Sequence, residues 1–166
     1  PIGINIDILR ALSKSMKRDF DIRLMKWSEA QKMLKDGNVH ALTEMAYSES
    51  RAQFFDFSDQ TLLYKYSFFV NTNDENIHQL SDAAGKIIAV TKGGYPFQLM
   101  VSNPQIKLQV VDTYLDGFQQ LLAGNADAVA ADAWVGAYLL EEHNLTDQIK
   151  YDNRSFAEQP GFIAVA

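Results

Sequence analysis

The sequence predicts an α/β protein made of two similar lobes, and three observations support this. Helix-like and strand-like apolar spacing alternate along the 166 residues. The order of residue types at 27–41 recurs at 114–128, 87 residues later. The composition, 47% hydrophobic and 22% charged, is that of an ordinary globular chain. The alternation predicts that each lobe is a mainly parallel sheet flanked by helices.

Composition also excludes several classes of function. Lys and Arg number 15 against 21 Asp and Glu, so the net charge of −6 argues against a nucleic-acid partner. With no cysteine there is no disulfide and no thiol nucleophile. His40, His78 and His143 lack ligand spacing, so we expect neither metal nor cofactor. No apolar stretch has the ~18–20 residues that span a bilayer.

Four segments place apolar side chains at helical intervals: 8–16, 27–34, 114–122 and 134–141. In the repeated unit, Ser28 with Gln31 and Thr113 with Asp116 predict capping boxes at the helix starts. A glycine suited to the left-handed C′ position follows each helix, namely Gly37 and Gly124. The unit indicates either two related lobes or two ordinary αβ units, since helix–glycine–strand is a common arrangement.

Short apolar runs between the helices predict strands. These runs are Ile22–Met25, Ala41–Met45, Tyr66–Val70, Lys86–Val90, Lys107–Val111, Ala126–Ala130 and Gly161–Ala166.

The repeat and the strands together predict the lobe boundaries. Lobe 1 is residues 1–70 plus 161–166, and it is incomplete at both ends because the chain starts and stops in mid-pattern. Lobe 2 is residues 71–160, inserted between two hinge crossings. The polar stretch 71–76 and the turn-like stretch 158–161 are the expected crossings. Two crossings would leave a cleft that can open and close.

Two charged residues at the ends of predicted strands are candidates for ligand binding. Arg51 follows Ser48, whose hydroxyl is suited to capping a short helix. The guanidinium of Arg51 can hold a carboxylate with two hydrogen bonds. Its other interpretation is a surface ion pair with Glu49 or Asp56. Asp132 can cap the helix that starts near residue 134 or hold an ammonium group. Five positions from Asp127, it faces the other side of a strand, so the two are no acid–base pair.

A pair of glycines follows the predicted strand Lys86–Val90. Gly93 and Gly94, between Lys92 and Tyr95, allow backbone N–H groups to approach an anion. The other interpretation is a tight turn between strand and helix.

Taken together, these segments resemble the family 3 extracytoplasmic solute-binding proteins, which have the two-lobed type II periplasmic-binding-protein-like fold known as the Venus flytrap. The resemblance runs through nearly the whole chain and rests on five motifs in the right order. These are Gly3–Leu9, Ser48-x-x-Arg51 with Phe55–Asp59, Lys92–Gly94, Leu121–Ala128 and Asp132.

The resemblance implies a binding site for an amino acid or a related polar solute. The arginine at the position of Arg51 holds the ligand carboxylate, and the acid at Asp132 pairs with its ammonium. The polar shell comes from two strand ends, at Thr43, Glu44, Met45 and Ala46 and at Thr91, Gly94 and Tyr95.

Some of these positions depart from the family pattern. Small hydroxyl residues are usual where Glu44 and Ala46 stand, and a Thr pair is common where Gly94 and Tyr95 stand. Glu44 adds a negative charge, which either pairs with Arg51 or selects a ligand with a second cationic group.

The resemblance implies a non-enzymatic, periplasmic module that closes on its ligand and acts on a membrane-embedded partner. The motifs around Arg51 and Gly93 favour the sensory input domain of a histidine kinase or diguanylate cyclase, tethered to the inner membrane. One alternative is the substrate-binding protein of an amino-acid ABC transporter. Others are a cyclic-acid dehydratase-like enzyme with Glu44 as its acid or base, and a degenerate module that binds nothing.

Overall fold

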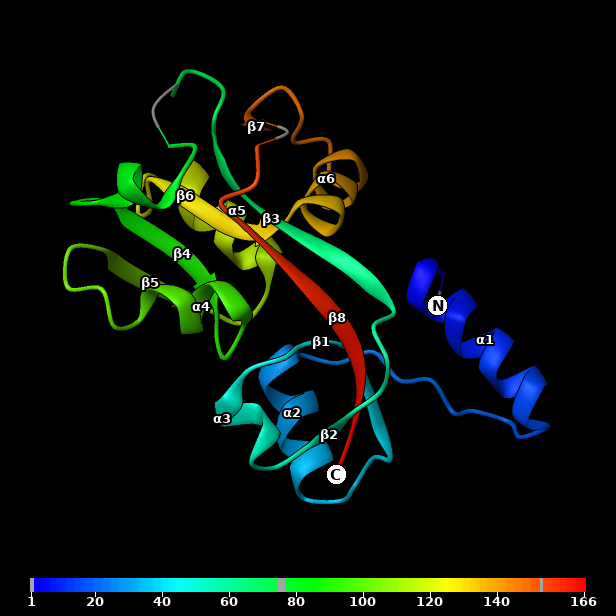
Figure 1. The fold of residues 1–166 in the computed structure, drawn as a ribbon. Coiled ribbons are helices and arrows are strands. Elements are labelled where there is room, and N and C mark those ends of the chain that lie inside the picture. Colours follow the sequence, from blue (N-terminus) through cyan, green and yellow to red (C-terminus); the bar gives the residue numbers. More distant parts are fainter. Residues whose placement is uncertain (1, 75–76, 153) are drawn as a thin grey trace.

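The computed structural model describes residues 2–74, 77–152 and 154–166 (Figure 1). The helices are α1 (Ile4–Met16), α2 (Trp27–Lys35), α3 (Glu49–Ala52), the 3₁₀ turn η1 (Leu80–Ala83), α4 (Tyr95–Met100), α5 (Tyr114–Leu122) and α6 (Ala133–Glu142). The strands are β1 (Ala41–Ala46), β2 (Asp56–Phe57), β3 (Leu62–Asn71), β4 (Ile87–Thr91), β5 (Lys107–Val111), β6 (Ala128–Asp132), β7 (Ile149–Tyr151) and β8 (Ala157–Val165). The α/β class is as predicted.

The strands form a single sheet in the order β1-β8-β3-β6-β4-β5, with β2 beside β8 and β7 beside β3. The molecule has two parts: the first contains α2, α3, β1 and β2, and the second contains β4–β7 with α4–α6 (Figure 1). The long strands β3 and β8 run side by side between these two parts. Beyond them, β4 pairs in parallel with β5 and β6, and α4 and α5 supply the crossovers that parallel pairs need.

The first part departs from the expected mainly parallel sheet. Both β1 and β2 pair antiparallel with β8. The reason is topological: β8 enters this part from the other end, so it runs against the strands it joins. The run Ile22–Met25, predicted as a strand, pairs with no strand among the described residues, and Leu24 is 77% exposed.

Three apolar clusters form the core. Leu34, Met45, Phe55 and Ala164 pack together in the part built from α2, β1 and β8. The other two clusters are centred on Phe68 and Phe69, neighbours on β3 whose side chains lie on opposite faces of the sheet. Each part of the molecule therefore has a core of its own.

The crossing between the parts lies in β3 and β8, where Leu62–Tyr66 pairs with Ala157–Gly161. The crossing predicted at 71–76 is wrong for residues 71–74, because Asn71 pairs with Ile149 of β7 and Thr72 bonds to Gln148. Residues 75–76 lie outside the described residues. The lobe boundaries themselves stay a prediction.

Helix termini follow local sequence rules with one exception. Thr113 and Asp116 form the predicted capping box of α5. Gly37 and Gly124 follow α2 and α5 with φ of 72° and 74°, the left-handed backbone that favours glycine. The predicted box at Ser28 is wrong, because Ser28 lies inside α2 and the N-cap position is Lys26, whose side chain makes no capping hydrogen bond.

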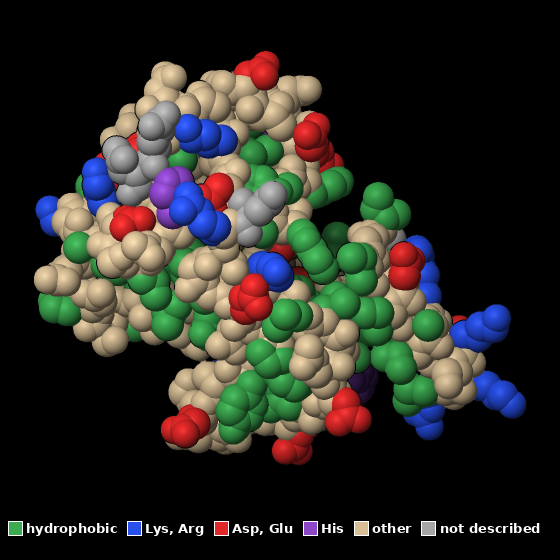
Figure 2. Space-filling model, turned by 45° about the horizontal axis from the view of Figure 1, so that its top comes forward, with side chains coloured by type: hydrophobic (Ala, Val, Ile, Leu, Met, Phe, Trp, Pro, Cys, Tyr) green, Lys and Arg blue, Asp and Glu red, His purple; other side chains and the backbone are tan. Residues whose placement is uncertain are grey.

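The first helix, α1, lies beside the rest of the molecule (Figure 1). Only Ile6 of its residues is buried. Figure 2 shows several Lys and Arg side chains at the side of the molecule where α1 lies. None of the described helices has the length and apolar character needed to cross a bilayer.

Candidate binding site

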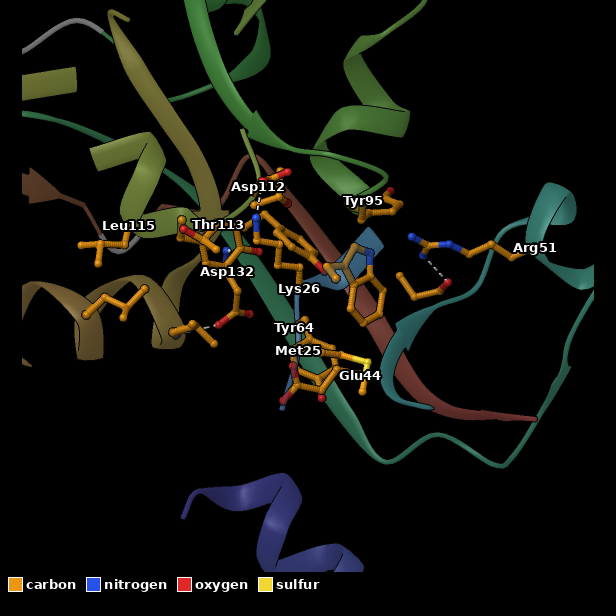
Figure 3. Close-up of a pocket in the computed structure, with 18 residues that line it drawn as sticks. Met25, Lys26, Glu44, Arg51, Tyr64, Tyr95, Asp112, Thr113, Leu115 and Asp132 are labelled. Atoms are coloured by element: carbon orange, nitrogen blue, oxygen red, sulfur yellow. Dashed lines mark hydrogen bonds and ion pairs between the residues drawn. The ribbon is translucent and has the colours of Figure 1, made fainter. Parts of the chain in front are cut away.

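A cavity of about 420 Å³ lies where the two parts of the molecule meet (Figure 3). Seven of the nine predicted site residues line it: Glu44, Ala46, Arg51, Thr91, Gly94, Tyr95 and Asp132. The volume falls in the range of small-molecule pockets, about 300–1,000 Å³. Residues distant in sequence, from β1, α3, β4 and β6, therefore converge on one space.

Arg51 reaches this cavity from α3, a helix of one turn. Ser48 caps α3 by accepting a hydrogen bond from the Arg51 backbone N–H. The Arg51 side chain is 4% exposed and donates from Nη1 to the Ala46 carbonyl at 2.7 Å and from Nη2 to the Gly93 carbonyl at 2.9 Å. Its Nε has no partner among the described residues. The alternative of a surface ion pair is wrong because the guanidinium is buried.

Asp132 stands at the end of β6 and is 6% exposed. Its Oδ1 accepts hydrogen bonds from the backbone N–H groups of Trp134 and Val135 at 3.0 and 2.9 Å. No hydrogen bond to its Oδ2 is found in the described part of the chain. Burial raises the pKa of this carboxyl, and the two backbone N–H groups oppose the rise. Asp132 is thus the predicted helix cap and a wall of the cavity at once.

Glu44 enters the cavity from a distorted point of β1. Its φ is 65°, in the left-handed region that residues other than glycine seldom adopt, and the pairing of β1 with β8 is irregular between Leu42 and Met45. The Asn5 side chain amide donates to the Glu44 carboxyl. Burial raises the pKa of Glu44, and the negative charge of Asp132 raises it further.

The glycine turn after β4 borders the cavity opposite Arg51. A Cβ at Gly94 would lie 2.5 Å from Thr91 Oγ1, so a side chain there would clash. The Gly93 carbonyl, rather than its N–H, faces the first part and accepts hydrogen bonds from Trp27 Nε1 and Gln31 Nε2 at 3.0 and 3.3 Å. Tyr95 Oη accepts a hydrogen bond from Gln159.

Two predicted site residues lie elsewhere. Thr43 and Met45 do not line the cavity, and Met45 is fully buried in the core around Leu34. Leu42 and Met45 both pack into the core around Leu34, so the regular alternation of side chains is interrupted at the bulge that turns Glu44 toward the cavity.

Sequence reasoning missed much of the wall. The missed residues include Met25, Lys26, Trp27, Tyr64, Tyr66, Asp112, Thr113, Tyr114 and Leu115. Lys26 and Asp112 form an ion pair of 2.5 Å that joins the two parts. Trp27 and Tyr114 begin the two repeated helices, and this matching placement of aromatic residues was the available signal. Nothing in the sequence marked the tyrosines of β3.

The aromatic residues give the cavity apolar faces around its charges. The rings of Tyr66 and Tyr95 lie 5.3 Å apart, and the Arg51 guanidinium lies 5.8 Å from the Trp27 ring. Burial raises the pKa values of Tyr64, Tyr66 and Tyr114, so these hydroxyls remain neutral hydrogen-bonding groups. Among the described residues, no cluster of three His, Asp or Glu side chains is placed to hold a metal ion.

Comparison with known proteins places these features in context. Residues 1–120 match the sequence profile of the bacterial extracellular solute-binding proteins, family 3. The glutamate-binding protein GluB of Corynebacterium glutamicum is 25% identical over 143 residues, which are 80% of this chain and 48% of that protein. The chain therefore spans about half the length of this curated relative.

Two solved structures share the whole fold. A histidine kinase sensor domain with similarity to periplasmic binding proteins is 27% identical with a TM-score of 0.90, and the match covers 99% of this chain and 72% of that one. The substrate-binding protein of an amino acid ABC transporter is also 27% identical, with a TM-score of 0.84 and coverage of 99% and 74%. The type II periplasmic-binding-protein-like fold is thereby confirmed.

Proposed function

Because the chain belongs to family 3 of the bacterial extracellular solute-binding proteins, we propose that it binds an amino acid in the cavity between its two parts. One observation carries the proposal: a buried guanidinium and a buried carboxyl, Arg51 and Asp132, line the same cavity from different parts of the molecule. A zwitterion needs this pair of opposite charges.

Arg51 and Asp132 each have an atom that can still form a hydrogen bond to a ligand. Arg51 Nε is buried and has no hydrogen-bond partner within the described ranges, and a buried unpaired donor is costly. A ligand carboxylate would satisfy it and can also accept from Nη2, the nitrogen now bound to Gly93. Asp132 keeps Oδ2 for an ammonium while Oδ1 holds the start of α6. Charge-assisted hydrogen bonds of this kind are stronger than neutral ones.

The proposal includes closure of the cleft on the ligand. The two lobes predicted as residues 1–70 with 161–166 and residues 71–160 would move about β3 and β8. The change from one lobe to the other then falls inside these strands, where Leu62–Tyr66 pairs with Ala157–Gly161. Arg51, Trp27 and Gln31 all donate across the cleft to the Gly93 carbonyl. A ligand held by groups of both lobes favours the closed arrangement because only that arrangement offers both contacts.

The binding role is proposed to be non-enzymatic and extracytoplasmic. The relatives are solute-binding proteins, and the name of the Corynebacterium relative specifies glutamate, an amino acid. Glu44 is the acid considered for a dehydratase-like role, and its carboxyl is hydrogen-bonded to the neutral side-chain amide of Asn5. We therefore assign Glu44 to binding.

Within this function we propose that the module is the sensory input of a membrane-tethered signalling protein, a histidine kinase or diguanylate cyclase. The likeness to a histidine kinase sensor domain supports it. The equal identity of the transporter component makes substrate delivery to an ABC transporter the second candidate. Ligand-dependent phosphorylation or cyclic-dinucleotide synthesis by the natural full-length protein in vesicles would favour the sensor, and ligand uptake would favour the transporter.

Thermal unfolding against the twenty amino acids, polyamines and small carboxylates tests the binding proposal. A ligand at 100 times its Kd adds about 2.7 kcal/mol, a shift of a few degrees for a chain of this size. We expect an amino acid to raise the Tm of the wild type and to leave the Tm of Arg51→Ala unchanged. If no amino acid shifts the wild type, the proposal fails and a non-binding module that contacts a partner replaces it.

A further inference from the structure

The position of Glu44 in the cavity requires a strained backbone conformation. A residue with a Cβ at a φ of 65° has a strained backbone, and glycine would relieve the strain. The irregular pairing beside it re-aims the strand. Strain of this kind persists where the surroundings enforce it, and it clusters at functional sites. Here its effect is to turn a carboxyl into the binding cavity.

The charges of the cavity do not balance when a simple amino acid is added. Lys26 is already paired with Asp112 at the rim. A zwitterion would neutralise Arg51 and Asp132 with its carboxylate and its ammonium. Glu44 would then stay as an uncompensated acid near Asp132, and a half-buried carboxylate with no counter-charge is costly.

Within the described part of the chain, no cation is found as a partner of the Glu44 carboxyl. Asn5 donates its amide to the carboxyl and lies within hydrogen-bonding distance of the Tyr64 hydroxyl, both neutral groups. The pairing of Glu44 with Arg51, one of the two alternatives expected from the sequence, is not found, because the Arg51 nitrogens that make bonds both donate to carbonyls.

We propose that Glu44 is a specificity-determining residue that binds a second cationic group of the ligand, so that the solute is an amino acid with a cationic side chain, an ammonium or a guanidinium. The inference rests on the proposed function, since Arg51 and Asp132 must hold the α-carboxylate and the α-ammonium. Glu44, Tyr64 and Met25 lie together on one side of the cavity, away from Arg51 (Figure 3). The side chain of such a ligand points to this corner, where the aromatic ring of Tyr64 covers its aliphatic stem.

Calorimetric titration with lysine and norleucine tests the inference, because norleucine has the same aliphatic stem as lysine and lacks the terminal ammonium. A hydrogen bond to a charged group is worth about 1.5–3 kcal/mol, so wild type should bind lysine roughly 10- to 100-fold more tightly than norleucine. Glu44→Gln keeps the size and the hydrogen-bonding capacity and loses the charge. It should reduce the preference to a few-fold while norleucine binding is kept or improved.

Glu49→Gln is the matched control, since Glu49 is exposed on α3 and lies outside the cavity wall. It should leave both affinities unchanged. Equal binding of lysine and norleucine to wild type overturns the inference while the amino-acid site stands. Binding of no amino acid overturns the proposed function and the inference together. The wild-type ratio needs no variant, so poor folding of Glu44→Gln would not block the test.

Discussion

The guanidinium of Arg51 donates a hydrogen bond across the cleft to the carbonyl oxygen of Gly93, 2.9 Å from Nη2. The same carbonyl also accepts hydrogen bonds from the Trp27 and Gln31 side chains. One backbone oxygen of the second part therefore accepts hydrogen bonds from three side chains of the first part. The group proposed to hold the ligand carboxylate is therefore also a group that holds the two parts together. The proposed ligand binding and the proposed closure would then be linked through this one side chain.

Replacing Arg51 with lysine should separate charge from geometry. Lysine keeps the positive charge but cannot bridge Ala46, Gly93 and a carboxylate as the planar fork does. We expect ligand affinity to fall ~10- to 100-fold, the loss of a charge-assisted hydrogen bond. Calorimetric titration measures it, with the exposed Arg23→Lys as the control. An affinity within twofold of wild type would mean that Arg51 acts only as a structural cross-link.

Two substitutions of Asp132 should divide its two roles. Asp132→Asn keeps an oxygen to accept from Trp134 and Val135 and loses the negative charge, so ligand binding should be lost while stability is kept. Asp132→Ala removes the cap as well, which costs about 0.5–2 kcal/mol. Urea unfolding measures the capping role of Asp132, and a binding assay measures its role as the ammonium anchor. If Asp132→Asn binds as wild type does, the ammonium anchor lies elsewhere.

Stability should depend on pH through the two buried acids. Burial raises the pKa values of Glu44 and Asp132 above their ordinary values of 4.5 and 3.8, so the folded protein holds protons that the unfolded chain has released. The free energy of unfolding therefore falls as pH rises from these ordinary values through the raised ones. Urea unfolding of the ligand-free protein between about pH 4 and pH 8 should show this decline.

The double variant Glu44→Gln/Asp132→Asn, compared with the wild type, tests whether these two acids cause the pH dependence of stability. The double variant should have a flatter profile and greater stability than wild type near neutral pH, because neither group then has to ionise in the folded state. A wild-type profile that rises over the same interval, or a double variant with an unchanged profile, would contradict the assignment of raised pKa values.

The ion pair between Lys26 and Asp112 should tune closure in a salt-dependent way. Both side chains are about half exposed, so solvent and salt screen their attraction. Lys26→Met should weaken ligand binding slightly at low salt and match the wild type at high salt. Lys32→Met removes an exposed ion pair within α2 and its first following turn and serves as control. A difference that persists at high salt would point to a packing role for Lys26.

The fold was largely predictable because its signals are local. The capping box of Thr113 and the glycine at 124 are read from a few neighbouring residues, and the structure has both as predicted. The direction of the strands in the first part was not predictable, since it depends on where β8 returns. The strand predicted at Ile22–Met25 is wrong for a similar reason: its apolar residues resemble a strand, but no strand in the described part of the chain pairs with it.

The candidate site was predictable at its charged anchors and less so at its walls. Arg51 and Asp132 stand at the ends of elements that the sequence indicates, and the family resemblance gave them roles. The placement of Met45 in the core and Glu44 in the cavity depends on strand facing and a local bulge, which single-sequence patterns do not encode. Lys26 and Tyr64 reach the cavity only through tertiary packing.

The most direct test of the account is calorimetric titration of the wild type with an amino acid that binds and with two truncated forms of it. One form is its carboxamide, which lacks the α-carboxylate, and the other is its deamino analogue, which lacks the α-ammonium. If Arg51 and Asp132 clamp a zwitterion, each truncated form should bind at least ~10- to 100-fold more weakly than the intact amino acid. Binding of either form as tightly as the intact amino acid would contradict the clamp.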